Sequence, residues 1–167
     1  MKNKLLKSIA LGVIIALAIA CQPKKEDSKT ADAPAVDKEK IKSEIVAMET
    51  VMADMYNMRS AASEEYYDDN ATSFSQNKPP LVGKFAIDKS IKDDLTSFAA
   101  GDVISFSVNE IFPSSDGNQV VEIGSYKVVD AKETVKFTGN YMSLFEKKDG
   151  KYVCIRDMGA SDMPKKQ

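Results

Sequence analysis

The sequence predicts one α+β domain in which N-terminal helices pack on one face of a curved, mainly antiparallel sheet. Two changes of pattern along the chain support this. In the first half of the domain apolar residues recur every three or four positions, as on one face of a helix, whereas from residue 104 they recur every second position, as in a half-buried strand. Turn-forming sequences divide the second half into segments of strand length. Helices followed by hairpin-linked strands are typical of an α+β fold.

The first predicted helix covers about residues 38–59. Its apolar residues follow one another at spacings of four and three, and they are Ile41, Ile45, Met48, Met52 and Met55. Such a stripe is most often the core-facing side of a helix, although methionines can also line a binding groove. The pattern is too short for a coiled coil. We therefore expect this helix to lie against the sheet.

A second, short helix is predicted over residues 61–67. The sequence Asp68-Asp69-Asn70 follows it, and these side chains favour turns because they bond to nearby backbone groups. We therefore expect a turn at 68–70.

A short strand over residues 71–75 and a third helix over 84–98 are expected next. Between them, Pro79 and Pro80 remove two backbone donors and predict a loop. The helix is predicted from the spacings of four, four and three residues between Ile87, Ile91, Leu95 and Phe98.

Four antiparallel strands are predicted after residue 103. The first is indicated by Ile104, Phe106 and Val108, which alternate with polar residues. Turns are expected at residues 113–118, 130–133 and 148–150, where aspartate, asparagine, serine and glycine gather. The strands should therefore form a meander of hairpins.

The first 20 residues predict an export signal. Lysines at positions 2, 4 and 7 precede an uncharged run from Ser8 to Ala20, which has the length of a signal sequence and is too short to span a membrane stably. The run Leu17–Cys21 resembles a lipobox, after which the cysteine carries a lipid. We therefore predict Cys21 as the lipid attachment site, with the protein anchored to a membrane of the bacterial cell envelope through that acylated residue. An ordinary secretory signal cut after Ala20 is the alternative, and it would leave a reactive free thiol.

The rest of the chain divides into three parts. Residues 21–37 contain mainly proline, alanine, serine, threonine and charged side chains, and they predict a flexible tether. Residues 38–162 form the predicted domain, and 163–167 a short tail. The domain is long enough to bury a core of ordinary size.

Composition excludes several classes of function. The chain has a net charge of −2 at pH 7, and loss of the three lysines in the predicted signal makes the mature protein more acidic, so nucleic-acid binding is not expected. Histidine is absent, which excludes catalytic triads with histidine and zinc sites with imidazole ligands. We expect no metal and no cofactor. Cys154 lies in an apolar strand sequence and is expected to be a small buried hydrophobe.

The order of these elements resembles the SnoaL-like domain of the nuclear transport factor 2 (NTF2) superfamily. The resemblance covers about residues 37–162 and rests on short sequences in the family's order: Met55-Tyr56-Asn57, Tyr66-Tyr67-Asp68-Asp69-Asn70-Ala71, Val82-Gly83-Lys84, Thr138-Gly139-Asn140-Tyr141 and Lys148-Asp149-Gly150-Lys151-Tyr152-Val153. It implies a cone-like fold in which a bent sheet wraps the helices around a cavity. It also implies a possible homodimer through the outer face of the sheet.

Two departures from the family bear on function. Ketosteroid isomerases of this superfamily carry a catalytic aspartate in the segment that corresponds to residues 73–76, and this chain has Ser-Phe-Ser-Gln there. That catalytic base therefore cannot be carried over. An aromatic residue is common in the stretch that corresponds to 157–162, where this chain has Gly159 or its neighbour.

Three residues are candidates for the lining of the cavity: Tyr56, Tyr141 and Asp157. The tyrosines could offer hydroxyl groups to a ligand, or they could be ordinary aromatic packing. Asp157 is expected on the same strand face as Val153 and Ile155, and the alternative is a strand-end carboxylate bonded to its neighbours. The pair Asp68 and Asp69 is more typical of a solvated turn than of a metal site. No catalytic residue is assigned.

The function predicted first is a membrane-anchored envelope lipoprotein whose domain binds a small apolar molecule or a protein partner without catalysis. The second is an isomerase, dehydratase or hydrolase that uses Asp157 with a tyrosine in the cavity. The third is a structural subunit whose cavity is filled by methionine and phenylalanine. A buried carboxylate that has a raised pKa and faces another polar group would favour the enzyme.

Overall fold

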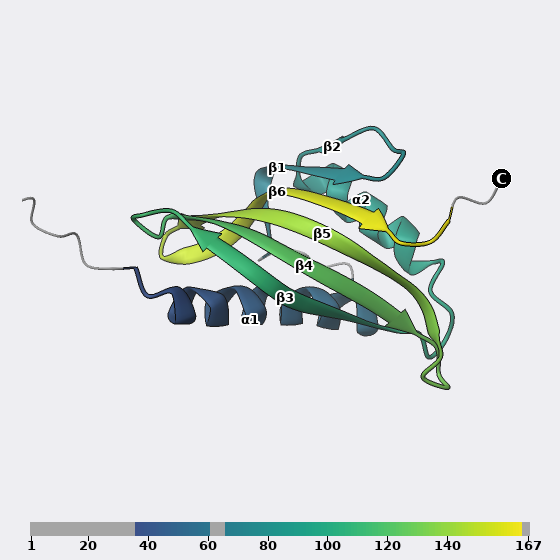
Figure 1. Cartoon of the computed structure of the whole chain (residues 1–167). Coiled ribbons are helices and arrows are strands. Elements are labelled where there is room, and N and C mark those ends of the chain that lie inside the picture. The colour runs from purple at the N-terminus through teal and green to yellow at the C-terminus, as the bar shows by residue number, and fades with distance from the viewer. Residues whose placement is uncertain (1–35, 61–65, 165–167) are drawn as a thin grey trace, which may run out of the picture. The chain divides into compact units, whose positions relative to one another are not determined.

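The computed structural model describes residues 36–60 and 66–164, all of which belong to one compact unit. Within them the chain forms two helices and six strands (Figure 1). In chain order they are α1 (Lys38–Asn57), β1 (Tyr67–Ser75), β2 (Leu81–Val82), α2 (Lys84–Leu95), β3 (Val103–Pro113), β4 (Gln119–Val129), β5 (Val135–Lys148) and β6 (Lys151–Ser161). The predicted signal, Cys21 and most of the tether lie outside the described residues.

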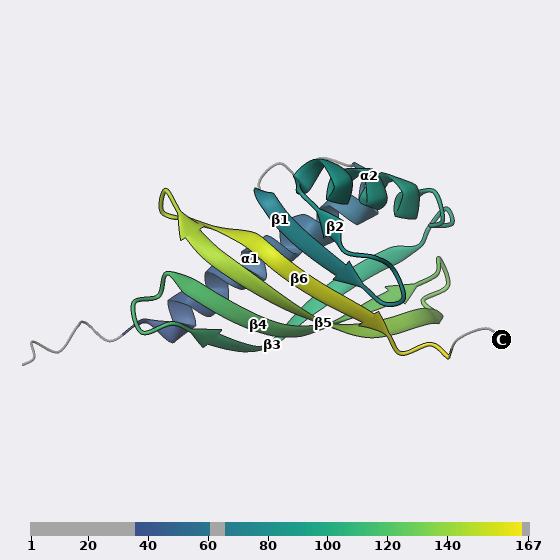
Figure 2. The ribbon, with the colours of Figure 1, turned by 90° about the horizontal axis from the view of Figure 1, so that it is seen from above.

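The six strands form one curved sheet in the order β2-β1-β6-β5-β4-β3. Every neighbouring pair is antiparallel except β1 and β6, which are parallel. Figure 2 shows α1 crossing the strands obliquely, with α2 beside β1 and β2. Both helices contribute side chains to a single buried cluster on one face of the sheet, here called the inner face. The predicted α+β fold, with helices on one face of a mainly antiparallel sheet, is confirmed.

The helix α1 is held at both ends by polar contacts. Asp37 caps its start, because Oδ1 accepts a hydrogen bond from the Lys40 amide at 3.0 Å. Asn57 ends it, and its side chain makes two hydrogen bonds with the backbone of Ile104 on β3, at 3.0 and 2.9 Å. The predicted apolar stripe faces the core as expected, with Met48 only partly buried.

The prediction for residues 61–70 was wrong in part. Residues 61–65 lie outside the described part of the chain, but Tyr67 begins a strand rather than ending a helix. Residues 68–70 belong to that strand too, although the turn-forming residues make a local hydrogen bond and the strand is irregular there. Asp68 Oδ1 accepts from the Asn70 amide at 3.0 Å, and the pairing of β1 with β6 shifts register between Tyr67 and Thr72.

The helix α2 stops three residues earlier than predicted. The hydroxyl groups of Thr96 and Ser97 each donate to a backbone carbonyl three residues back, which closes the last turn. Phe98 therefore lies beyond the helix, where its ring packs 5.7 Å from the ring of Tyr56.

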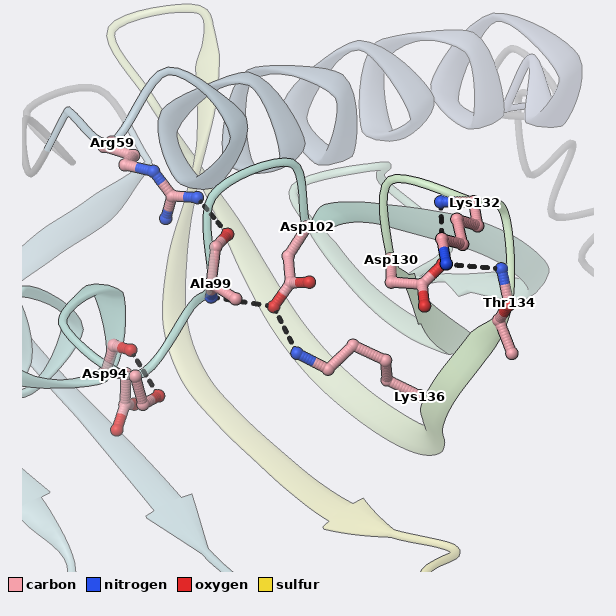
Figure 3. Close-up of polar contacts among 9 residues, drawn as sticks. Arg59, Asp94, Ala99, Asp102, Asp130, Lys132, Thr134 and Lys136 are labelled. Atoms are coloured by element: carbon pink, nitrogen blue, oxygen red, sulfur yellow. Dashed lines mark hydrogen bonds and ion pairs between the residues drawn. The ribbon is translucent and has the colours of Figure 1, made fainter.

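The four later strands and their turns are confirmed. The hairpin between β5 and β6 turns at Asp149 and Gly150, both with positive φ, as expected of an Asp-Gly turn. The turn between β4 and β5 is built around Asp130, whose Oδ1 accepts from the amides of Lys132 and Thr134 (Figure 3).

The connection from α2 to β3 is fastened by a buried aspartate (Figure 3). Asp102 accepts from the Ala99 amide at 2.9 Å and from the Lys136 ammonium on β5, and the hydrogen bond from Lys136 lowers the pKa of Asp102. Arg59, just after α1, donates to the Ala99 carbonyl at 2.6 Å. These contacts fix the end of α1 against the start of β3 and β5.

Candidate functional site

The inner face of the sheet carries three adjacent rows of side chains, each formed by residues that pair across β4, β5, β6 and β1. We call them the apolar row (Val120, Phe145, Cys154 and Tyr67), the polar row (Glu122, Ser143, Asp157 and Ser73) and the glycine row (Gly124, Tyr141, Gly159 and Ser75). Their chemistry changes abruptly from one row to the next, although they are neighbours on the same strands.

The apolar row is fully packed. Val120, Phe145 and Cys154 are 0% exposed, and Phe145 lies edge-on to the ring of Tyr66. The prediction for Cys154 is confirmed. Because burial raises the pKa of its thiol, this cysteine has no nucleophilic thiolate at neutral pH.

In the glycine row, tyrosine rings lie across glycines on the neighbouring strand. Gly124 pairs with Tyr141, and a Cβ at Gly124 would lie 2.2 Å from the Tyr141 ring. One step further along the sheet, Gly139 pairs with Tyr126, and a Cβ there would lie 2.3 Å from that ring. On the other side of Tyr141, a Cβ added at Gly159 would meet no atom within 4 Å. The glycines thus let the rings lie flat on the sheet, and they leave the space beside Gly159 open.

A cavity of about 170 Å³ lies over the polar and glycine rows. Met52 and Tyr56 of α1 and Ile87 and Ile91 of α2 form its apolar walls. The carboxyl groups that reach it belong to Glu49, Asp94 and Asp157, and no lysine or arginine is among its described lining residues. The third predicted function required methionine and phenylalanine side chains to fill the cavity. They leave it open instead.

Asp157 is held in the cavity wall by a tyrosine on the neighbouring strand. The Tyr67 hydroxyl donates to Asp157 Oδ2 at 2.6 Å, while Oδ1 is buried without a donor in good geometry. Burial raises the pKa of Asp157, and the hydrogen bonds of Ser73 and Tyr67 oppose the rise. The site thus contains a buried carboxyl group beside a phenol.

The predicted strand face of Asp157 was wrong. The register between β5 and β6 shifts at one point: Phe145 pairs with Cys154, but Leu144 pairs with Arg156, so Ile155 is an extra residue. Such a β-bulge reverses the alternation of side chains beyond it. Asp157 therefore points to the same face as Cys154, and not to the face of Val153.

An acidic pair, Glu49 and Glu122, lies between α1 and β4, and Glu49 also lines the cavity. Glu49 accepts from the Tyr66 hydroxyl at 2.6 Å, and Glu122 accepts from the Tyr141 hydroxyl at 2.8 Å. Burial raises the pKa of Glu49 to about 7 and that of Glu122 to about 8, and each carboxyl group also affects the pKa of the other. At neutral pH the pair therefore retains a proton.

Both predicted tyrosines lie on the cavity wall, and they differ in bonding. The Tyr141 hydroxyl is committed to Glu122. Tyr56 packs its ring between those of Phe98 and Phe106, and burial raises the pKa of its hydroxyl. Asp94 and Asp157 both raise the pKa of that hydroxyl electrostatically, so Tyr56 lies near both carboxyl groups.

Other predicted polar residues lie away from the cavity. Asp68 forms an ion pair with Lys148 at 2.7 Å, on the surface. Arg156 is exposed, and its guanidinium donates to backbone carbonyls, including that of Asn70 at 3.3 Å. Neither residue reaches the cavity.

Sequence reasoning missed Glu49, Glu122 and Tyr67. Glu49 could have been identified from the sequence, because it lies four positions after Ile45 and three before Met52, on the buried stripe of α1. A charged residue on such a stripe signals a buried polar contact. Glu122 gave no such signal, because apolar residues occupy both faces of β4 around it.

No protein-family model and no curated protein sequence matches the chain. Solved structures do match it. A domain of unknown function with a cystatin-like fold from Nostoc punctiforme PCC 73102 aligns with a TM-score of 0.62 and 14% identity over 82% of this chain and 81% of that one. An NTF-2 like protein of unknown function from Shewanella oneidensis MR-1 aligns at 0.58 and 18% identity, over 71% and 97%.

ActVI-ORFA from Streptomyces coelicolor also aligns, with a TM-score of 0.60 and 12% identity over 74% of this chain and 98% of that one. None of the described helices is long and apolar enough to cross a membrane. Identities this low speak for the fold and not for shared chemistry. The two helices, the curved six-stranded sheet and these likenesses together show that the chain contains a domain of the NTF2-like, cystatin-like fold.

Proposed function

We propose that the protein is an envelope lipoprotein whose domain binds a small, largely apolar molecule in its cavity without transforming it. The observation that carries the binding role is the cavity itself, which has aliphatic and aromatic walls with carboxyl and serine hydroxyl groups among them. Concave, mostly apolar sites with few convergent polar groups are the usual form of small-molecule sites.

A cavity-filling variant tests the binding role. Gly159→Phe adds a ring where a Cβ meets no atom within 4 Å, so it should occupy the cavity without disturbing the sheet. We expect 2-phenylethanol, a neutral one-ring probe, to perturb the amide NMR signals of Met52, Tyr56 and Ile91 in the parent protein and not in the variant. The matched control is Ala160→Phe, because Ala160 is exposed on the opposite face of β6. Equal perturbation in Gly159→Phe and the parent protein would contradict the proposal.

The anchoring part of the proposal rests on the sequence around Cys21. Cys21→Ser should lose the acyl mass and move from the membrane to the soluble fraction. A Cys154→Ser control should keep both, because Cys154 is buried within the domain. A membrane-bound Cys21→Ser protein would refute lipidation at this residue.

The second candidate function is an isomerase, dehydratase or hydrolase, and the Asp157–Tyr67 contact favours it. A buried carboxyl group with a raised pKa beside a phenol is an arrangement that acid–base catalysis uses. Turnover of any substrate should then fall by about 100-fold or more in Asp157→Ala. Tyr67→Phe should shift the pH profile, since it removes a hydrogen bond that favours the charged carboxylate. Unchanged turnover in Asp157→Ala would eliminate this candidate.

A homodimer through the outer face of the sheet is also proposed. Phe74 pairs with Met158 and Met158 with Met142, and these three side chains are 36, 59 and 49% exposed. Ile123 continues the row on β4. A contiguous apolar patch of this kind is typical of an interface. Met142→Glu combined with Met158→Glu should give a monomer by light scattering, whereas Phe85→Glu, an exposed site on α2, should not change the mass.

A further inference from the structure

The charge in the cavity is of one sign. Asp94 comes from α2 and Asp157 from β6, and both reach the cavity, where no basic side chain is among the described lining residues. Glu49 of α1 reaches it too, but its carboxyl group is bonded to Tyr66 and coupled to Glu122. Lys78 pairs with Asp94 at 3.9 Å, but its side chain is 59% exposed and it is not among the described lining residues, so solvent weakens the pair. Inside the cavity a bound anion would be repelled by the carboxylates, whereas a cation would be attracted to them.

The two carboxyl groups flank an aromatic surface. The Tyr56 ring lines the same cavity as both carboxyl groups, and Phe98 and Phe106 pack against it. On the sheet side of the cavity, the ring of Tyr141 lies over Gly124 and the ring of Tyr126 lies over Gly139. Aromatic faces attract organic cations, and the attraction is strongest where water is excluded. Asp157 adds a buried oxygen, Oδ1, that has no donor in good geometry.

The number of carboxyl groups favours an organic cation over a metal ion. Calcium takes six to eight oxygen ligands. Among residues 36–60 and 66–164 no group of three or more acidic or cysteine side chains is arranged to hold a metal. An ammonium group needs only a few acceptors, and two carboxylates with a hydroxyl group can satisfy it.

We propose that the ligand of this cavity is a small amine in its protonated form, with the ammonium group between Asp94 and Asp157 and the apolar part against the tyrosine rings. The inference rests on the proposed binding function and specifies the class of ligand. It does not follow from the fold, because the two aspartates and the lack of a basic side chain among the described lining residues are features of this chain.

Three probes of nearly equal size and different charge test it: phenethylamine, 2-phenylethanol and phenylacetate at pH 7. We expect phenethylamine to bind the full-length protein roughly tenfold more tightly than the alcohol, a ratio equivalent to one well-placed charge pair, and phenylacetate to bind most weakly. The measurement is titration followed by amide NMR shifts of the cavity residues.

Substitutions locate the effect. Asp94→Asn and Asp157→Asn should each reduce the preference for the amine over the alcohol at least severalfold while leaving the affinity for the alcohol nearly unchanged. The matched control is Asp93→Asn, which removes the same charge from the same helix at a side chain that is 67% exposed and paired with Lys89. The control should keep the preference, which separates a bound cation from general attraction to an acidic protein.

The outcomes separate this inference from the function on which it rests. Equal binding of the amine and the alcohol would overturn the inference and leave a neutral-ligand cavity. An amine preference that survives both aspartate substitutions would overturn it too, because the cation would then not be held by Asp94 and Asp157. Binding of all three probes that persists unchanged in Gly159→Phe would instead overturn the proposed cavity function.

Discussion

The apolar row and the glycine row run parallel on the inner face of one sheet, with only the polar row between them, yet one is solid and the other hollow. At Phe145 the interior is filled by a large ring with no exposed surface. At Tyr141, earlier on the same strand, the ring folds onto a glycine and space remains beside Gly159. The difference shows that glycines at two strand positions, Gly124 and Gly159, leave the space for the cavity, and not a separate loop or lid.

The polar row between them explains why the hollow side does not collapse. Glu122, Ser143 and Asp157 occupy positions that would otherwise hold aliphatic side chains. Tyr141 donates to Glu122 and Tyr67 donates to Asp157, and these hydrogen bonds hold the phenol groups against the sheet, so the rings cannot swing in to fill the space. Close packing is therefore concentrated on the apolar side, and open space on the other.

The largest expected effect is the loss of packing in the apolar row. Phe145→Ala should lower the free energy of unfolding by about 3–5 kcal/mol, because it removes a fully buried ring and leaves a void. Urea denaturation monitored by circular dichroism measures it. A loss below about 1 kcal/mol would show that the two rows do not differ in packing.

The acidic pair of Glu49 and Glu122 should make the free energy of unfolding depend on pH. The pKa values of Glu49 and Glu122 are about 7 and 8 in the folded protein, above the ordinary 4.5, so the protonated groups favour folding. This contribution is complete below about pH 4.5 and is lost as pH rises toward 8, at up to about 1.4 kcal/mol per pH unit for each extra proton held. Denaturation midpoints between pH 4.5 and 8.5 measure the slope.

Glu122→Gln should flatten that slope, because a neutral amide replaces the group that titrates. Glu110→Gln, exposed on the outer face of β3, should leave it unchanged. A slope of the same size in Glu122→Gln would assign the pH dependence to other groups.

A methyl group at Gly124 tests whether the glycines shape the cavity. Gly124→Ala places a Cβ 2.2 Å from the Tyr141 ring, so the ring must lift off the sheet and break its bond to Glu122. We expect a loss of about 1–3 kcal/mol from overpacking, together with weaker binding of a cavity probe. Thermal unfolding and probe titration report the two effects, and an unchanged Tyr141 side-chain NMR signal would contradict them.

The smallest effect is expected at the neighbouring glycine of the same row. Gly159→Ala adds a methyl group into open space, so stability should change by less than about 0.5 kcal/mol. A loss as large as that of Gly124→Ala would mean that the space beside Gly159 is not open.

The sequence predicted the helices and the hairpin strands well because their signals are local. The stripe of α1 and the Asp-Gly turn after β5 each depend on residues a few positions apart. The start of β1 was not predictable in this way. Tyr67 enters the sheet through pairing with Cys154, which lies 87 positions later in the chain, and this pairing overrides the turn preference of Asp68–Asn70.

The candidate site could be predicted only in outline. Tyr56, Tyr141 and Asp157 were selected for their residue types, and the structure places all three in the lining of one cavity; their role in binding stays a prediction. The orientation of Asp157 was missed because a single extra residue at Ile155 changes the face, and no local pattern marks it. The flat tyrosines were missed because the glycines that permit them lie on other strands.

That extra residue in β6 has a wider consequence. If the ladder were regular, the side chain that follows Cys154 on the inner face would be Arg156, and Asp157 would face outward. For this sequence, the bulge therefore decides whether the chamber presents a carboxylate or a guanidinium. The same residues paired without the bulge would turn Arg156 inward, so strand register sets the charge of the interior together with the residue types.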